Sequence, residues 1–192
     1  MQGISLIVGL GNPRPEYAET RHNAGFRFLD ALLSGSNTML RRESRFSGDA
    51  ARFAVGGKDL WLLAPQTFMN HSGDSVATFA GYYKIPAAEI LVVYDEIDLP
   101  PGVVRLKVGG GSAGHNGLTD VIEKLGSADC ARLRIGVGHP GSAAQVVTYV
   151  LKRPPASEQK LIDDAIDRVR EQLPDIVRGE FHKVMNALHT HK

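Results

Sequence analysis

Side chains that could take part in hydrolysis follow four separate apolar segments of the chain. In chain order they are Asn12, Tyr17, His22, Met69, Asn70, Asp95, His115 and Asn116. A histidine held by a carboxylate can take a proton from water, and such general base catalysis contributes ~10²–10⁴-fold to a rate. Asparagine amides offer two donors and an acceptor without charge, so they can hold a water, a carbonyl or a peptide backbone. If the apolar segments are strands of one sheet, these side chains can converge on one cleft.

Each of these residues also has an ordinary structural explanation. Asn12 precedes Pro13 and Asn116 precedes Gly117, and both are common turn positions. His22 could cap a helix entrance, and Asp95 could be an acid in a turn. Their repeated occurrence at the ends of apolar segments favours the hydrolytic interpretation without deciding it.

Two glycine-containing motifs suggest other activities. Gly9-Leu10-Gly11 begins like a dinucleotide-binding fingerprint, but Arg14 occupies the third glycine position and flanking prolines disrupt the turn, so we reject it. Gly110 to Gly114 matches G-x-S-x-G, which would make Ser112 the nucleophile of a serine esterase. That motif requires a strand directly before it and a helix directly after it, and here the helix pattern starts late. The same glycines could form an anion-binding nest near Lys107 and Arg134, or a plain flexible turn.

Composition excludes several classes of protein. The chain has 192 residues, a net charge of +1 and one cysteine, Cys130, so no internal disulfide can form within it. The short apolar run at the N-terminus lacks a basic flank, and no apolar stretch approaches the ~20 residues that span a bilayer. We therefore expect a cytoplasmic protein with no membrane association. No histidine or cysteine spacing typical of metal sites is present, and we expect no metal and no cofactor.

The hydrophobic pattern predicts one α/β domain over residues 1–192, with a twisted mixed β-sheet flanked by helices and with C-terminal helices. The predicted strands are Ile4–Leu10, Phe53–Val55, Leu60–Ala64, Ile90–Tyr94, Val103–Val108 and Arg132–Gly138. The predicted helices are Ala24–Leu33, Ser75–Tyr83 and Leu118–Leu125, followed by two C-terminal helices with a break at Pro174. Gly56-Gly57 predicts a hairpin, so part of the sheet should be antiparallel. The segment from Met39 to Arg52 is basic and mixed, and its pattern gives no clear assignment.

Five stretches, in this order and spacing, resemble the bacterial peptidyl-tRNA hydrolase family. They are GLGNPRPEYAETRHNAG, TFMNHSG, YDEIDLPPG, KVGGGSAGHNGL and RLRIGVGHPG, and the match extends from Ile4 to about Pro155. The resemblance implies a monomeric enzyme that hydrolyses the ester between a peptide and the 3′ ribose of tRNA, without metal or cofactor. It also implies release of tRNA for translation.

The resemblance assigns roles to individual residues. His22 is similar to the family's general base, Asp95 to its orienting partner, and Asn70 and Asn116 to the residues that position the water, the carbonyl and the sugar. The remaining implied substrate contacts are Asn12, Tyr17 and Met69 in the cleft and Lys107 and Arg134 at the tRNA 5′ phosphate. Residues 141–151 resemble the lid over the cleft.

This sequence departs from the family pattern at Tyr94 and His71, and at Ser112-Ala113 in the glycine-rich loop. None of these departures touches a residue implied to be catalytic. Two other functions remain open from sequence alone. One is a serine esterase using Ser112, and the other is an RNA-binding module that binds tRNA without cleaving it.

Overall fold

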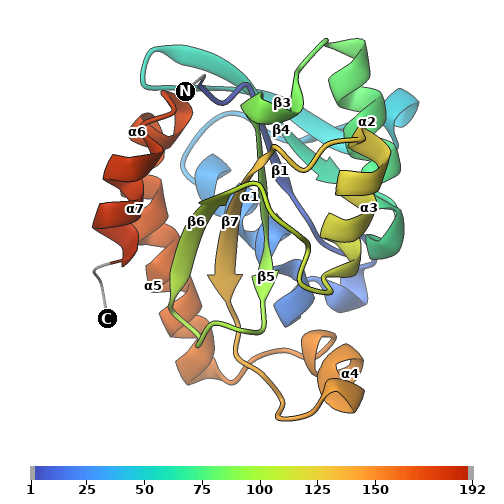
Figure 1. Cartoon of the computed structure of the whole chain (residues 1–192), viewed down its shortest axis with the longest axis vertical. Helices are drawn as coiled ribbons and strands as arrows, with labels where there is room; N and C mark the ends of the chain where they lie inside the picture. The colour runs from blue at the N-terminus through green and yellow to red at the C-terminus, as the bar shows by residue number, and fades with distance from the viewer. Residues whose placement is uncertain (1–2, 190–192) are drawn as a thin grey trace.

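A mixed seven-stranded β-sheet runs through the middle of the molecule in the order β2-β3-β4-β1-β5-β7-β6 (Figure 1). The computed structural model describes residues 3–189. The strands are β1 (Leu6–Gly9), β2 (Arg41–Glu43), β3 (Gly48–Val55), β4 (Lys58–Pro65), β5 (Ile90–Glu96), β6 (Val104–Val108) and β7 (Ala131–Gly136). Strands β4, β1, β5 and β7 are parallel, whereas β2, β3 and β6 pair antiparallel to their neighbours. The predicted α/β class with a mixed sheet is confirmed.

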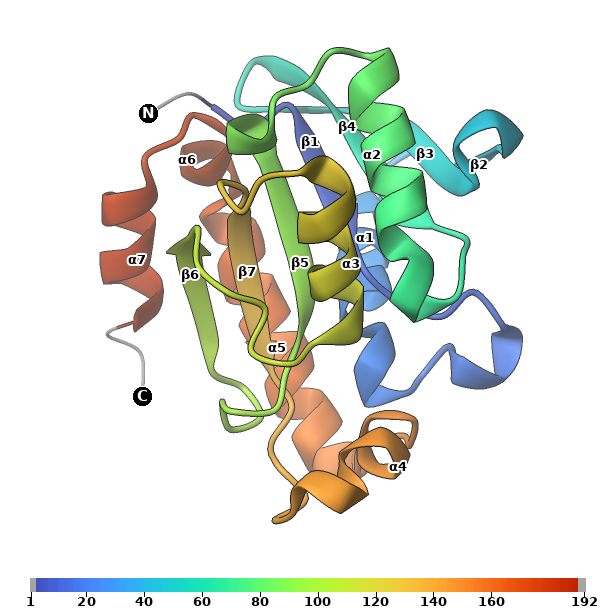
Figure 2. The same cartoon turned by 45° about the vertical axis from the view of Figure 1, so that its right-hand side comes forward.

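Helices cover both faces of this sheet (Figures 1 and 2). They are α1 (Ala24–Leu33), α2 (Ser72–Tyr82), α3 (Asn116–Leu125), α4 (Val146–Val150), α5 (Ala156–Glu171), α6 (Leu173–Val177) and α7 (Phe181–His189). Helices α1, α5, α6 and α7 pack on one face, and α2 and α3 pack on the other. Short α4 lies beyond the edge at which the parallel strands end.

Strand β5 lies inside the sheet between β1 and β7, and all seven of its residues are buried. Leu91 and Val93 face the core beneath α1 and α5, while Val92 and Tyr94 face the core beneath α2 and α3. This two-sided burial is why the segment reads as an unbroken apolar run instead of an alternating one. The strand ends in two buried acids, so its carboxyl end carries charge into the molecule.

The C-terminal helices differ from the prediction in number. A break does occur beside Pro174, because α5 ends at Glu171 and Pro174 lies in the first turn of α6, where its missing N–H has no helical partner to lose. A further break near Gly179 gives three helices after residue 155 instead of two. In addition, β6 is antiparallel to β7, so the carboxyl end of β6 lies at the opposite end of the strands from the carboxyl ends of β1, β4 and β5. The glycine-rich segment 109–115 then carries the chain back to the start of α3 (Figure 2).

The other elements agree closely with the predicted ones. The helix over 24–33 is confirmed as α1, and the Gly56-Gly57 hairpin is confirmed as the β3–β4 turn. The unassigned basic segment contributes the short edge strand β2 and the beginning of β3. Within residues 3–189, no helix is long and apolar enough to cross a membrane.

Candidate active site

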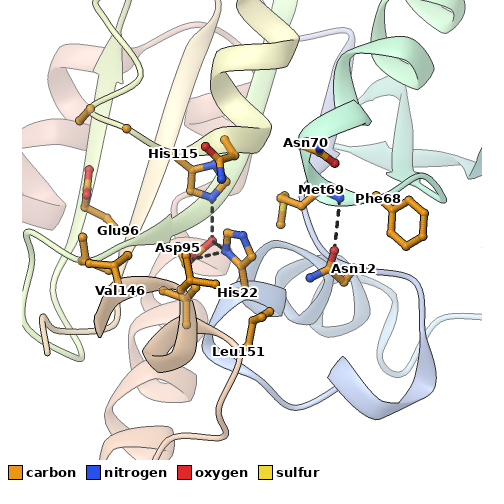
Figure 3. A pocket seen from close by; sticks show the side chains of 16 residues that line it. Asn12, His22, Phe68, Met69, Asn70, Asp95, Glu96, His115, Val146 and Leu151 are labelled. Carbon is orange, nitrogen blue, oxygen red and sulfur yellow. Dashed lines mark hydrogen bonds and ion pairs between the residues drawn. The ribbon is translucent and has the colours of Figure 1, made fainter. Parts of the chain in front are cut away.

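Asp95 lies between two histidines at the carboxyl end of β5 (Figure 3). Nδ1 of His22 lies 2.8 Å from Oδ2 and 3.0 Å from Oδ1 of this carboxylate. Nε2 of His115 lies 2.8 Å from Oδ1. The Asp95 side chain is only 2% exposed, and the two imidazole rings are 5.0 Å apart. One buried carboxylate therefore holds both rings.

The hydrogen bonds of His115 fix its tautomer. Its Nδ1 accepts the N–H of Leu118 at 3.2 Å, so in the neutral ring the proton must be on Nε2, which donates to Asp95. His22 in its neutral form donates its Nδ1 proton to the same carboxylate. Its Nε2 then carries a lone pair, and no group within residues 3–189 hydrogen-bonds to that atom. His22 also lines the cavity, so this is the arrangement of a general base.

The electrostatics of the three groups favour an ionised Asp95. Burial alone would raise its pKa, but the opposing effects of His22 and His115 are larger together and hold the pKa well below its usual range. Burial lowers the pKa of His22, but the charge and hydrogen bond of Asp95 outweigh this and raise it above its usual value. Burial, followed by the charge of Glu96, raises the pKa of Tyr94 to about 12, so the phenol packed edge-on against His115 stays neutral.

His22 reaches this position because α1 packs very closely on β1. A side chain at Gly9 would meet the carbonyl oxygen of Gly25 at 2.3 Å, and one at Gly25 would meet the backbone nitrogen of Leu10 at 2.4 Å. Only glycine at both positions allows this approach. The short turn that contains His22 is thereby held against the end of β1 and β5.

Asn12 is fixed by a residue whose role was not predicted. Buried Asn23 accepts the N–H of Asn12 at 2.8 Å and donates to its carbonyl oxygen at 2.9 Å, so one amide side chain satisfies both backbone groups. The side-chain oxygen of Asn12 accepts the N–H of Met69 at 3.2 Å. Its side-chain NH₂ group makes no hydrogen bond within residues 3–189, and Asn12 lines the cavity.

These side chains border a cavity of about 340 Å³. Asn70 and Asn116 are exposed at its rim and come from the turn after β4 and the first position of α3. The other lining residues form a mixed polar and apolar wall: Asn12, His22, Phe68, Met69, Asp95, Glu96, Ile97, Ala113, Gly114, His115, Val146, Val147, Val150 and Leu151. Asp95, His22 and His115 lie between Glu96 on one side and Asn12 and Asn70 on the other, and Leu151 lies below them in the view of Figure 3.

Helix α4 is connected to the turn that contains His22 through Arg21. The guanidinium of this buried residue stacks 3.8 Å from the centre of the Tyr149 ring and donates to the Tyr149 carbonyl at 3.0 Å. The Tyr149 hydroxyl donates to the carbonyl of Val137 at 2.7 Å. Helix α4, which lines the cavity, is therefore attached to Arg21, the residue before His22.

Three predicted substrate contacts do not line the cavity. Tyr17 is half-buried in the short turn Pro15–Tyr17, and Lys107 is exposed near the far end of β6. Arg134 lies on β7, where its Nε donates to Glu96 of the cavity wall at 2.9 Å. The structure thus brings the predicted catalytic residues to one cavity and leaves Lys107 and Arg134 outside it.

The serine-esterase alternative lacks its required geometry. Ser112 lies in the loop well after β6 ends, and its hydroxyl accepts a hydrogen bond from Thr119 at 2.6 Å. Within residues 3–189, no histidine side chain hydrogen-bonds to the Ser112 hydroxyl. Cys130 is fully buried.

One group of side chains has donor atoms close enough to surround a metal ion. It is His22, Asp95 and His115, whose ligand atoms all lie within 4.8 Å of one another. In the structure both imidazole rings direct one nitrogen at the carboxylate instead, so hydrogen bonds occupy the oxygens of Asp95. The absence of a metal requirement stays a prediction.

Comparison with known proteins matches the whole chain. The family model described as peptidyl-tRNA hydrolase matches residues 6–192. A peptidyl-tRNA hydrolase of Yersinia enterocolitica is 52% identical over 193 residues, which cover 100% of this chain and 98% of that protein. One of Neisseria gonorrhoeae is 50% identical, with 97% of each chain covered. The crystal structure of the Acinetobacter baumannii peptidyl-tRNA hydrolase superposes with a TM-score of 0.94 at 46% identity, covering 98% of this chain and 95% of that one.

Proposed function

The chain belongs to the peptidyl-tRNA hydrolase family, and we propose that it performs the family's ester hydrolysis with His22 as the general base. The reaction releases free tRNA and a peptide from the ester at the 3′ ribose. The observation that carries the mechanism is the hydrogen bond of His22 Nδ1 to buried Asp95, which leaves Nε2 as the acceptor facing the cavity.

The proposed steps conserve atoms and charge. Nε2 of His22 takes a proton from water while the water oxygen adds to the ester carbonyl carbon. The resulting imidazolium is stabilised by the ionised Asp95. Collapse of the tetrahedral intermediate breaks the bond to the ribose 3′ oxygen, which takes the proton from His22. The products are a peptide acid, which ionises in water, and tRNA with a free 3′ hydroxyl.

The amide side chains have roles that suit their positions. The free NH₂ group of Asn12 and the exposed amides of Asn70 and Asn116 can hydrogen-bond the water, the peptide backbone or the developing oxyanion. Such donors are worth about 10²–10³-fold in rate when they meet an oxyanion. The apolar wall formed by Met69 and α4 would contact the peptide without selecting it by the charge of its side chains.

The tRNA partner is proposed to extend beyond the cavity. The family resemblance assigns Lys107 and Arg134 to the tRNA 5′ phosphate and Tyr17 to a substrate contact in the cleft, although Tyr17 does not line the cavity. Residues 141–151 include α4 and are proposed as the lid. We propose that the enzyme acts as a monomer, as the family resemblance implies. Because peptidyl-tRNA arises in translation, we infer that the enzyme works in the cytoplasm.

The test asks whether water or Ser112 attacks the ester. The unaltered chain should hydrolyse N-acetylaminoacyl-tRNA under single-turnover conditions without accumulating an acyl-enzyme. Ser112→Ala should keep normal turnover, and a fluorophosphonate should not label the protein. Covalent labelling of Ser112, together with inactivity of Ser112→Ala, would refute activation of water by His22.

A further inference from the structure

Arg132 is a buried cation without a carboxylate partner. It lies on β7 with 0% of its surface exposed and is the largest fully buried side chain within residues 3–189. Within residues 3–189, no carboxylate oxygen lies within 4.0 Å of it. Its Nε atom is buried with no hydrogen-bond partner. Buried charges are normally paired, so this one requires an explanation.

The guanidinium of Arg132 connects the two chain segments on either side of α3. Nη1 donates to the carbonyl of Gly111 at 2.6 Å, and Nη2 donates to the carbonyl of Ala128 at 3.0 Å. Gly111 belongs to the segment 109–115, which runs from the end of β6 back to the start of α3 beside the active site (Figure 2). That loop ends at His115 and Asn116, so Arg132 fixes the approach to both residues.

A second cation, Lys107, lies near Arg132 on the neighbouring strand, and both approach Gly110. Lys107 on β6 is the direct cross-strand partner of Arg132 on β7. A Cβ atom built on Gly110 would lie 2.7 Å from Nζ of Lys107 and 3.9 Å from Nη1 of Arg132. Like charges opposite each other on neighbouring strands destabilise a sheet. Neither cation has a carboxylate within 4.0 Å inside the described range, so an anion bound here would relieve their repulsion.

We propose that Arg132 is a positioning residue for the tRNA 5′ phosphate: it holds the glycine-rich loop 109–114 in place and adds buried positive charge behind Lys107. It acts without touching the phosphate, because its side chain is completely covered. Lys107 and Arg134 reach the surface and make the contacts. This inference rests on the proposed function, since the phosphate belongs to the same substrate.

The experiment compares two substrates that differ only at the 5′ end. N-acetylaminoacyl-tRNA is prepared with a 5′ phosphate or with a 5′ hydroxyl, and kcat/KM is measured for each. The unaltered chain should prefer the phosphorylated substrate. Arg132→Met should lower the ratio of the two kcat/KM values by about tenfold, as expected for loss of one nearby charge partly screened by water. Arg132→Lys should keep most of the ratio, because it retains the charge and loses only the planar fork.

Arg168→Gln is a matched control. Arg168 also donates to a glycine carbonyl, that of Gly102 at 2.7 Å, and also has a buried Nε without a partner, but it lies on α5. This variant should lose a comparable amount of stability and keep the full substrate ratio. A general loss of packing would lower activity on both substrates equally and leave the ratio unchanged.

The outcomes separate this inference from the proposed function. A ratio near one in the unaltered chain, or an unchanged ratio in Arg132→Met, overturns the inference, as does an equal fall in Arg168→Gln. Should Arg132→Met fail to fold, Arg132→Gln makes the same test, because its amide retains a donor for the carbonyl of Gly111 while the charge is lost, and it must lower the ratio. Absence of hydrolysis of either substrate by the unaltered chain would instead refute the proposed function.

Discussion

Replacing Asp95 with asparagine should disable His22 by forcing it into the wrong tautomer. Oδ1 of Asp95 accepts from Nε2 of His115 at 2.8 Å, and Oδ2 lies 2.8 Å from Nδ1 of His22. His115 must remain a donor at Nε2, because its Nδ1 accepts the N–H of Leu118. The oxygen of the new amide will therefore face His115, and its NH₂ group will face His22. Nδ1 of His22 must then accept, so its proton moves to Nε2 and the base is lost.

The expected magnitude is large and appears mainly in kcat. General base catalysis contributes ~10²–10⁴-fold, and the corresponding change in a serine protease triad lowers kcat about 10⁴-fold by the same tautomer effect. We expect Asp95→Asn to reduce kcat by about 10³-fold with KM nearly unchanged. The assay is steady-state hydrolysis of N-acetylaminoacyl-tRNA, with tRNA binding measured separately to show that the fold persists.

A second substitution tests the tautomer argument itself. In Asp95→Asn combined with His115→Ala, nothing holds the amide oxygen on the His115 side, so the amide can rotate and accept from Nδ1 of His22. We expect the double variant to be about tenfold more active than Asp95→Asn alone, the value of one hydrogen bond to a charged or polar partner. A double variant no faster than the single one, or an Asp95→Asn enzyme within tenfold of normal, would refute the reasoning.

Three further results are expected. Activity should fall as pH drops below the raised pKa of His22, because the base must be neutral, and a pH profile of kcat checks this. The same raised pKa stabilises the fold below about pH 6.5, and this stabilisation is lost as pH rises through the folded pKa. The free energy of unfolding measured across this pH range checks that second expectation. Asn23→Ala should cost about 1–3 kcal/mol in the free energy of unfolding by denaturant, because both backbone groups of Asn12 lose their partner; a smaller change would show that water replaces the amide. Tyr149→Phe should raise KM about 2–10-fold with kcat nearly constant, since α4 loses its bond to Val137; a pure kcat effect would contradict a covering role.

Local elements could be read from the sequence because their signals are local. The apolar run from Ile90 is a strand buried on both faces, and the Gly56-Gly57 pair is the turn of a hairpin. The meeting of His22 with Asp95 was expected from polar residues at the ends of parallel strands, and their side chains do lie 2.8 Å apart. These features depend on periodicity and turn chemistry, which a single sequence displays.

The remaining features depend on strand order and on packing across the sheet, which the pattern of one segment does not contain. His115 was predicted to follow a strand ending at the cleft, but β6 ends at the opposite edge and a loop returns the chain. The hydrogen bond between His115 and Asp95 was missed for that reason, as was the acceptance of the Leu118 N–H by His115 at the start of α3. Asn23 was missed because its partners are backbone atoms, and Arg132 because nothing local predicts a buried unpaired guanidinium.

The most direct test of the account is the single-turnover rate of His22→Ala beside its affinity for uncleaved tRNA. His22 is the group whose free Nε2 faces the cavity, and the proposed mechanism makes it the only base that acts on water. We expect the rate to fall by ~10²–10⁴-fold while the Kd for tRNA stays within about threefold of normal. Normal hydrolysis by this variant would contradict the central claim.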